Sequence, residues 1–390
     1  MGQTIRETDA RYVADTYARF PVTLVRGSGS LVWDETGREY IDLGSGIAVT
    51  SFGIADPVWT QAVTAQLGQL QHTSNLYYTS PCAVLAQKLC EKTGMKKVFF
   101  GNSGAEANEC AIKVARKYAQ EKKGSAYGTI VTLHNSFHGR TLTTLAATGQ
   151  EHYHELFQPL TPGFVHVHAG DVAELEAVLA KEKVAGILLE VIQGEGGVCV
   201  VDDAYLQAVQ ALAQAHDVLL MIDEVQTGNG RTGEMYAYMH AGLKPDVVTT
   251  AKGLGGGLPI GACLIGEKAE HVLGHGDHGS TFGGNPVACA GAISIVDRLD
   301  DALLAGVQEK GKYILTELSQ AQGVREVSGR GLMIGILPEK RKAADVVMGC
   351  LEKGVLCLTA KDRVRLLPAL NIPMETLEKA LQVVKEELAK

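Results

Sequence analysis

Hydrophobic and polar positions in the central part of the chain follow a regular alternation of strand-like and helix-like segments. Seven short apolar runs of strand length occupy residues 97–101, 128–133, 164–167, 185–191, 218–223, 246–250 and 260–266. Longer segments with helical spacing of apolar residues separate them, among others residues 104–121, 171–182 and 203–216. This alternation predicts an α/β fold with a mostly parallel seven-stranded sheet and helices on both of its faces.

The two ends of the chain follow a different pattern. Residues 1–50 contain short strands around a turn at Asp34 to Gly37, and this segment is too small for a core of its own. Asn285 and Pro286 predict the start of a helix, after which helices alternate with short strands to the end. We therefore expect residues 51–284 to form a large domain, and residues 1–50 and 285–390 to join in a smaller α+β domain.

Composition and charge exclude several classes of function. The chain has 390 residues, a net charge of −8 and an isoelectric point near 5.9, with no long basic run, which argues against nucleic-acid binding. No apolar stretch is long enough to cross a membrane, and the N-terminal segment lacks the pattern of a signal peptide. Eight scattered cysteines without a C-x-x-C pair, and histidines without a ligand spacing, predict buried thiols, no metal site and a cytoplasmic protein.

Two chemically reactive side chains stand at the ends of neighbouring predicted strands. Asp223 ends the run 218–223, and Lys252 follows the run 246–250 and precedes a glycine-rich segment. Ligands of parallel α/β sheets bind at the carboxyl ends of the strands. Pyridoxal phosphate needs both groups, because its aldehyde forms a Schiff base with a lysine and a carboxylate keeps its ring nitrogen protonated. On their own, a helix cap and a surface lysine explain the pair equally well.

The turn after residues 97–101 has the features of a phosphate site. Ser103 and Glu106 fit a capping box, and Gly104 leaves backbone N–H groups accessible at the start of the following helix. The helix dipole adds to the attraction for an anion. An ordinary capped helix has the same pattern, so the turn alone does not decide between the two.

Two further turns carry side chains suited to an aromatic cofactor and a carboxylate substrate. Phe137, His138 and Arg140 follow the run 128–133, where an aromatic ring can cover a pyridine ring and a guanidinium can bind a carboxylate. Glu195 lies in a glycine-flanked turn after the run 185–191, although a solvated loop acid would look the same. Five consecutive turns with related chemistry favour one shared site.

A dinucleotide-binding motif is the main competing interpretation. Gly228, Gly230 and Gly233 match G-x-G-x-x-G after a strand. However, four residues separate the strand from the first glycine, and no acidic residue ends a strand about 20 residues further on. A nicotinamide or flavin oxidoreductase is therefore disfavoured.

Six segments together resemble a known family. NSGAEANECAIKVARK, HNSFHGRT, LEVIQGEGGV, IDEVQTGNGRTG, AKGLGGGLPIGA and GSTFGGNP are similar, in this order, to motifs of the class-III (ornithine-type) pyridoxal-phosphate aminotransferases of fold type I. The resemblance extends over essentially the whole chain and is nearest to the bacterial members that act on N-acetylornithine. It implies pyridoxal 5′-phosphate as the cofactor.

The resemblance also implies residue roles. Lys252 would bind the cofactor covalently, Asp223 would pair with its ring nitrogen, and Gln226 would lie near its phenolic oxygen. The full implied cofactor site consists of Ser103, Gly104, Ala105, Phe137, His138, Asp223, Val225, Gln226, Lys252 and Thr281. Thr281 would come from the neighbouring subunit, which implies a homodimer with composite active sites.

The implied substrate site contains Arg140, Ser280, Glu195, Arg365 and Tyr17. Arg140 would bind a substrate carboxylate, and Ser280 and Tyr17 would contact the substrate. Glu195 and Arg365 would form a gate in which the glutamate neutralises the arginine for one substrate and releases it for the α-carboxylate of the other.

The implied reaction is a ping-pong transamination in arginine biosynthesis. N2-acetyl-L-ornithine and 2-oxoglutarate would give N-acetyl-L-glutamate 5-semialdehyde and L-glutamate. Succinylornithine and N-succinyl-diaminopimelate aminotransferases remain alternatives, because the sequence does not reveal the pocket for the acyl group. A non-catalytic binding protein of the same fold is a third possibility, which the presence of Lys252 and Asp223 disfavours.

Overall fold

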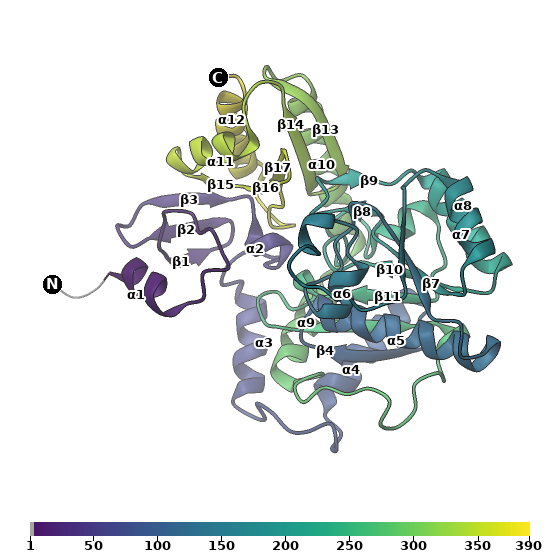
Figure 1. The fold of residues 1–390 in the computed structure, drawn as a ribbon. Helices are drawn as coiled ribbons and strands as arrows, with labels where there is room; N and C mark the ends of the chain where they lie inside the picture. The colour runs from purple at the N-terminus through teal and green to yellow at the C-terminus, as the bar shows by residue number, and fades with distance from the viewer. Residues whose placement is uncertain (1–3) are drawn as a thin grey trace.

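A seven-stranded sheet forms the centre of the molecule (Figure 1). A computed structural model describes residues 4–390. The strands lie in the order β4-β12-β11-β10-β7-β5-β6, and only β12 runs antiparallel to its neighbours. Their bounds are β4 Lys97–Gly101, β5 Thr129–Leu133, β6 Phe164–Val167, β7 Val184–Leu189, β10 Leu219–Asp223, β11 Val247–Thr250 and β12 Gly261–Ile265. The predicted fold class is confirmed, and each of the seven strands lies where the sequence predicts it.

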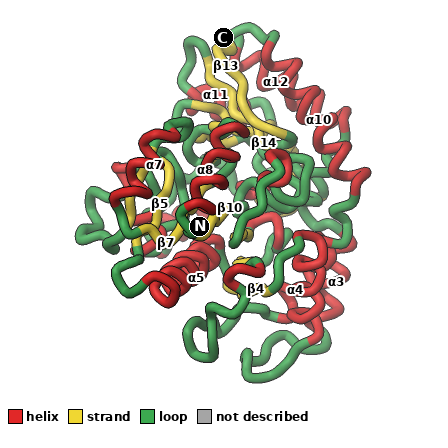
Figure 2. Tube along the Cα trace, turned by 90° about the vertical axis from the view of Figure 1, so that its right-hand side faces the viewer, coloured by secondary structure: helices red, strands yellow, loops and turns green. Residues whose placement is uncertain are grey.

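Helices cover both faces of this sheet, as the tube view in Figure 2 also shows. The longest, α5 (Gly104–Lys123), packs against β7, β11 and β12 with a continuous buried stripe of small and aliphatic residues. The other helices of this part are α3 Pro57–Leu67, α4 Ser80–Thr93, α6 Leu142–Ala147, α7 Val172–Lys181, α8 Asp203–Ala215 and α9 Pro286–Val296. All residues of β7 and β10 are buried, as expected for central strands covered on both faces.

Two four-stranded sheets lie beside the large one and contain both ends of the chain. The first has the order β1-β2-β3-β15, and its parallel β3–β15 pair joins the N-terminal segment to the C-terminal one. The second has the order β13-β14-β17-β16 and is entirely antiparallel. The strand bounds are β1 Leu24–Ser28, β2 Leu31–Asp34, β3 Glu39–Asp42, β13 Val324–Arg330, β14 Met333–Pro338, β15 Val355–Leu356, β16 Leu358–Ala360 and β17 Arg363–Leu366. Helices α10 (Asp301–Ser319), α11 (Ala343–Glu352) and α12 (Met374–Leu388) pack against these sheets.

The β3–β15 pair joins the two ends of the chain, and the division into residues 1–50, 51–284 and 285–390 stays a prediction. The first three residues of the predicted range 1–50 lie outside the described residues. Two elements were not expected. Helix α1 (Ile5–Tyr12) has no buried residue and depends on a capping box between Thr4 and Glu7, so no apolar periodicity reveals it. Strand β13 has the sequence VREVSGR and no fully buried residue, so it lacks the apolar run that marks the strands of the large sheet.

The short remaining elements lie mainly in the turns around the sheet. They are α2 Ser45–Ala48, β8 Ile192–Gln193, β9 Cys199–Val200 and the 3₁₀ helices η1 Glu151–Tyr153, η2 Ala237–Ala241, η3 Lys252–Leu254 and η4 Glu267–Ala269. Among residues 4–390, no helix combines the length and the apolar character that a membrane span requires.

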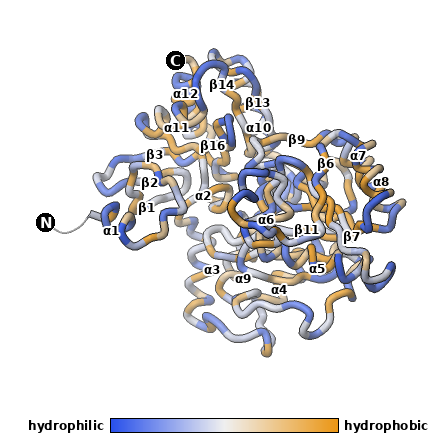
Figure 3. Tube along the Cα trace, viewed as in Figure 1, coloured by the Kyte–Doolittle hydropathy of each residue, from blue (hydrophilic) through white to orange (hydrophobic). Residues whose placement is uncertain are grey.

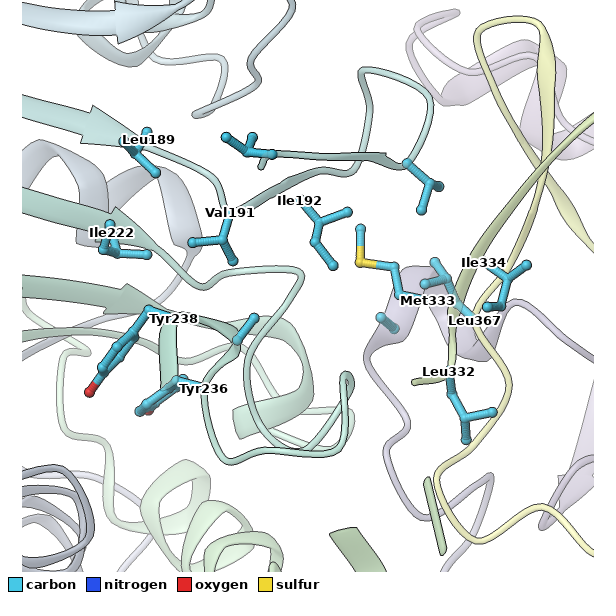
Figure 4. Close-up of a cluster of buried hydrophobic side chains, with 14 of the residues drawn as sticks. Leu189, Val191, Ile192, Ile222, Tyr236, Tyr238, Leu332, Met333, Ile334 and Leu367 are labelled. Carbon is cyan, nitrogen blue, oxygen red and sulfur yellow. The ribbon is translucent and has the colours of Figure 1, made fainter. Parts of the chain in front are cut away.

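One hydrophobic cluster joins the large sheet to the second small sheet. Ile222 on β10 and Leu189 on β7 face it from one side, and Met333 and Ile334 on β14 face it from the other (Figure 4). The hydropathy colouring in Figure 3 likewise places apolar segments at the strands and on the helices that cover them. This shared core fixes β17, which carries Arg365, relative to the turns that follow the large-sheet strands.

Candidate active site

A cavity of about 410 Å³ opens where the turns after β4, β5, β7, β10 and β11 meet. Ten residues predicted from the sequence line it: Ser103, Gly104, Ala105, Phe137, His138, Glu195, Asp223, Val225, Gln226 and Lys252. The remaining walls come from the segment 257–260 and from a few residues that the sequence did not single out. The turns brought together are those at the carboxyl ends of parallel strands, as expected for a ligand site of an α/β sheet.

Asp223 is a buried carboxylate at the end of β10 with an organised set of donors. Its Oδ2 accepts hydrogen bonds from His138 Nδ1 and Asn108 Nδ2, both at 2.8 Å, and its Oδ1 accepts from the Val225 N–H at 3.0 Å. Within residues 4–390 no lysine or arginine forms an ion pair with it. These three hydrogen bonds leave the carboxylate with acceptor capacity for a further donor in the cavity.

Lys252 follows β11 and begins the 3₁₀ helix η3. Its φ of 46° lies in the left-handed region, which is uncommon for a residue with a side chain and marks a conformation that the surroundings impose. Burial lowers the pKa of Lys252 below its ordinary value, while the nearby Glu195 carboxylate works in the opposite direction. A lowered pKa makes the neutral amine, which is the nucleophilic form, more accessible.

The N-terminus of α5 forms the opposite wall. Ser103 Oγ accepts from the Glu106 N–H at 3.2 Å, as the predicted capping box requires. The reciprocal half differs from the prediction, because Glu106 Oε2 accepts from the N–H of Asn102 instead of that of Ser103. A side chain at Gly104 would place its Cβ 2.6 Å from Val225 Cγ1, so only glycine lets the helix start approach the turn after β10. The first N–H groups of the helix thus face the cavity without intrahelical partners.

Glu190 connects two of the turns. Its Oε1 accepts from the Phe137 N–H at 2.8 Å and its Oε2 from the Gly194 N–H at 3.0 Å. Burial raises the pKa of Glu190 to about 7. Glu190 also lines the cavity, although the sequence analysis did not assign it to the site.

Glu195 and Arg365 form a two-pronged ion pair at the edge of the cavity. Arg365 Nη1 lies 2.6 Å from Glu195 Oε1, and Nη2 lies 3.3 Å from Oε2. Gln226 bridges them, since its Oε1 accepts from Arg365 Nη1 at 2.9 Å and its Nε2 donates to Glu195 Oε1 at 3.2 Å. Burial alone would raise the pKa of Glu195, but the charge of Arg365 and its hydrogen bonds outweigh burial and lower it.

Five predicted residues do not line the cavity. Arg365 is one of them, although it contacts Glu195 and Gln226, which do. Arg140 is exposed and lies over the rings of Phe137 and Tyr153, at 5.8 and 5.3 Å from their centroids. Tyr17 is also exposed. It lines a separate cavity between the N-terminal segment and residues 347–358 of the C-terminal segment. Ser280 lies next to the cavity wall, because its Oγ accepts a hydrogen bond from the side chain of Asn102, which lines the cavity. Thr281 is exposed in the single chain, and its role across a subunit interface stays a prediction.

Sequence reasoning missed Asn108, whose amide donates to Asp223. The sequence does contain a sign of its role, because Asn108 is a polar residue on the buried face of α5, one turn after Gly104. A buried polar side chain needs a hydrogen-bond partner, and here the partner is Asp223. The competing glycine motif has a packing role: side chains at Gly230 and Gly233 would collide with Leu299 and Gln308, respectively. No group of three or more His, Cys, Asp or Glu side chains within residues 4–390 is arranged to hold a metal ion.

Comparisons with known proteins agree with this geometry. The family model described as aminotransferase class-III matches residues 12–388. The acetylornithine aminotransferase of Haemophilus ducreyi is 53% identical over 386 residues, which cover 99% of this chain and 98% of that protein. Both chains therefore align over essentially their full lengths.

Solved structures give the same result. The ornithine aminotransferase of Toxoplasma gondii, whose description reports partial occupancy of PLP at its active site, superimposes with a TM-score of 0.94 at 33% identity and covers 99% of this chain and 94% of its own. The N-acetylornithine aminotransferase of Stenotrophomonas maltophilia superimposes with a TM-score of 0.85 at 36% identity and covers 98% of each chain. Because the family model matches nearly the whole chain and a full-length relative is 53% identical, the protein belongs to the class-III aminotransferases.

Proposed function

We propose that the protein transfers the terminal amino group of N2-acetyl-L-ornithine to 2-oxoglutarate, giving N-acetyl-L-glutamate 5-semialdehyde and L-glutamate. Pyridoxal 5′-phosphate is the cofactor. The observation that carries the proposal is that Lys252 and Asp223, from different strand ends, line one cavity together with the N-terminus of α5. The choice of donor is supported by the names of full-length relatives such as that of Haemophilus ducreyi.

The residues of the cavity fit this cofactor in three ways. The N–H groups at Gly104 and Ala105 suit a phosphate, because the start of a long helix is positively polarised. Asp223 offers a buried carboxylate without a cationic partner among the described residues, which suits a protonated ring nitrogen. Phe137 and Val225 line the same cavity and supply apolar surfaces for the ring.

When bound, pyridoxal phosphate would supply an aldehyde for the amino group of the donor and a ring that can withdraw electrons from the donor carbon. Lys252 holds the cofactor between turnovers and, once displaced, removes the proton from the donor carbon as a general base. Burial lowers the pKa of Lys252, which favours the neutral amine needed for this step. Asp223 would pair with the protonated ring nitrogen, and Gln226 would lie near the phenolic oxygen.

Glu195 and Arg365 decide which substrate carboxylate the site accepts. In the closed pair both oxygens of Glu195 face Arg365, so Arg365 is neutralised for a donor that presents no α-carboxylate there. Glutamate and 2-oxoglutarate carry an α-carboxylate that competes with Glu195 for the guanidinium. Arg140 and Ser280 bind the remaining polar groups, with Tyr17 as a further contact.

The proposal includes a cytoplasmic homodimer in which Thr281 of one subunit completes the phosphate site of the other. Apolar side chains near Thr281 support this assembly, among them Leu76, Tyr78 and Phe282, all of which are exposed in the single chain. Neither nucleic acid nor a membrane is a partner in this proposal.

The absorption spectrum of purified protein supplied with pyridoxal phosphate tests the function directly. We expect a visible band of bound cofactor that disappears on addition of N-acetylornithine without a keto acid and returns with 2-oxoglutarate. A band that responds to N-succinylornithine or N-succinyl-diaminopimelate instead would replace the proposed donor and leave the cofactor in place. A Lys252→Ala variant should lose the covalent link to the cofactor, and absence of a band in the parent protein would refute the proposal.

A further inference from the structure

We propose that Asn108 is a positioning residue that holds the Asp223 carboxylate in its orientation toward the cofactor. The proposal rests on the proposed function, because it concerns the partner of the cofactor's ring nitrogen. Asn108 is 1% exposed and lies on the inner face of α5, one helical turn after Gly104. Its amide makes three hydrogen bonds to three different segments of the chain.

The hydrogen bonds of Asn108 reach three segments of the chain that contribute to the cavity. Nδ2 donates to Asp223 Oδ2 on β10 and to the carbonyl oxygen of His138 in the turn after β5, both at 2.8 Å. Oδ1 accepts from Thr249 Oγ1 on β11 at 2.6 Å, three residues before Lys252. Because Asn108 itself belongs to α5, one side chain connects the phosphate helix with the segments of Asp223, His138 and Lys252.

These partners fix the orientation of the amide. Two acceptors, a carboxylate and a carbonyl, surround Nδ2, so a flipped amide would place its oxygen against both of them. Thr249 lies opposite Asp223 in the parallel pairing of β10 with β11, and its hydroxyl donates to Oδ1. Thr249 therefore holds Asn108 in the orientation in which Asn108 can only donate to Asp223.

A donor in this position influences where the cofactor's ring proton resides. Hydrogen bonds to a carboxylate stabilise its charged form and so reduce its tendency to take up a proton. Asp223 Oδ2 receives two such bonds, from Asn108 and His138, while Oδ1 accepts one hydrogen bond, from the Val225 N–H. A carboxylate held in this orientation by Asn108 would stabilise a protonated ring nitrogen, which is the form of the cofactor that withdraws electrons.

The decisive measurement is the ¹⁵N chemical shift of ring-labelled pyridoxal phosphate bound to the parent protein and to Asn108→Leu. We expect the shift of a protonated ring nitrogen in the parent and a change toward the unprotonated value in the variant. The rate of the half-reaction with N-acetylornithine alone should fall about 10- to 100-fold, which is the effect of losing a hydrogen bond to a charged group. The donor concentration at half-maximal rate should stay unchanged, because the polar atoms of the Asn108 side chain are bonded to Asp223, His138 and Thr249.

Two further variants separate positioning from general stability. Thr249→Val removes only the bond that anchors Oδ1, and it should move the ¹⁵N shift and the rate in the same direction by a smaller amount. Gln150→Leu removes another buried amide hydrogen bond, from Nε2 to the Ser136 carbonyl at 3.0 Å, without touching Asp223. This control should lower the melting temperature of the cofactor-free protein and leave the ¹⁵N shift at the parent value.

The outcomes distinguish the inference from the function on which it rests. If the parent binds no pyridoxal phosphate or does not react with N-acetylornithine, the proposed function fails. If the parent does both, while Asn108→Leu and Thr249→Val keep the parent ¹⁵N shift, Asn108 has only a structural role and the inference is overturned. Should Asn108→Leu not fold, Thr249→Val decides the question, since it replaces a buried hydroxyl with a methyl group of similar size.

Discussion

At the scale of single residues, the charge of Arg365 is balanced by Glu195 alone among the described carboxylates. Arg365 is 2% exposed, and its two terminal nitrogens both contact Glu195. A buried arginine that loses its only carboxylate partner binds another one strongly, because an unpaired buried charge is costly. The identity of residue 195 therefore controls which substrate is favoured.

We predict that Glu195→Gln raises the preference for glutamate over N-acetylornithine as amino donor. Glutamine keeps the shape but leaves Arg365 charged and available for an α-carboxylate, so the ratio of the two kcat/KM values should change by about tenfold or more. Steady-state kinetics with each donor measure this ratio. As a control, Glu326→Gln removes a more exposed pair with Arg363 on the same strand as Arg365 and should leave the ratio unchanged. Equal losses for both donors in Glu195→Gln would argue against the gate.

A second single residue, Glu224, makes the free energy of unfolding depend on pH. It is fully buried, its Oε1 accepts from the Tyr238 N–H at 2.8 Å, and its Oε2 accepts from Thr227 Oγ1 at 2.6 Å. Burial raises the pKa of Glu224 from 4.5 to about 7. Between these two values the folded protein binds a proton that the unfolded chain does not bind, so the free energy of unfolding falls as pH rises through this range.

We predict that Glu224→Gln flattens this dependence. The contribution of Glu224 is complete below about pH 4.5 and is lost by about pH 7, with a maximum of roughly 3 kcal/mol. Urea unfolding of the parent at pH 5.5 and pH 8 should therefore show a larger difference than unfolding of Glu224→Gln, in which residue 224 cannot ionise. Glu190 has the same raised pKa and should maintain part of the dependence in the variant. Identical pH profiles for the two proteins would contradict the assignment.

At the scale of elements, the start of α5 shows how one missing side chain shapes the cavity. The close approach of Gly104 to Val225 brings the helix N-terminus to the turn after β10. A methyl group at this position has to displace Val225 or the helix end. Either movement changes the distance between the phosphate site and the ring site. Binding requires one particular distance, because the phosphate and the ring belong to one small, rigid molecule.

We predict that Gly104→Ala weakens binding of pyridoxal phosphate by about tenfold or more, the cost of an overpacked contact. The dissociation constant can be measured by titrating cofactor-free protein. Gly306→Ala is a matched control in helix α10, because a Cβ there meets no atom within 4 Å. This control should stabilise the protein by about 0.5–1 kcal/mol through helix propensity and leave the affinity unchanged. An unchanged dissociation constant in Gly104→Ala would show that the close approach is not needed.

The elements also show what the sequence could and could not predict. The central strands of the large sheet were predictable because they are short buried runs of mostly aliphatic or β-branched residues. Asp223 and Lys252 were predictable because the ends of parallel strands meet at one edge of a sheet. The hydrogen bond from Asn108 to Asp223 joins residues 115 positions apart, and no local pattern encodes such a contact. Helix α1 has no buried face, so its sequence lacks the periodicity on which the prediction relied.

At the scale of the whole molecule, one apolar surface adjoins the predicted intersubunit residue. We call it the 76–78 surface and define it by Leu76, Tyr77 and Tyr78, which are 87%, 69% and 106% exposed. Asn75 attaches this segment to the loop of Thr281, since its Nδ2 donates to the carbonyl oxygens of Ser280 and Gly283 at 3.1 and 2.9 Å. A dimer that covers this surface would therefore also position the Thr281 loop.

We predict that the double variant Leu76→Asp, Tyr78→Asp shifts the protein from dimer to monomer and weakens cofactor binding at the same time. Two buried carboxylates would oppose association strongly, because they lose hydration without gaining partners. Sedimentation velocity measures the assembly, and titration of cofactor-free protein measures the affinity. Val172→Asp, which changes an exposed apolar residue at the start of α7, should affect neither. A monomer that binds pyridoxal phosphate as tightly as the parent would show that each chain completes its own phosphate site, and an unchanged dimer would place the interface elsewhere.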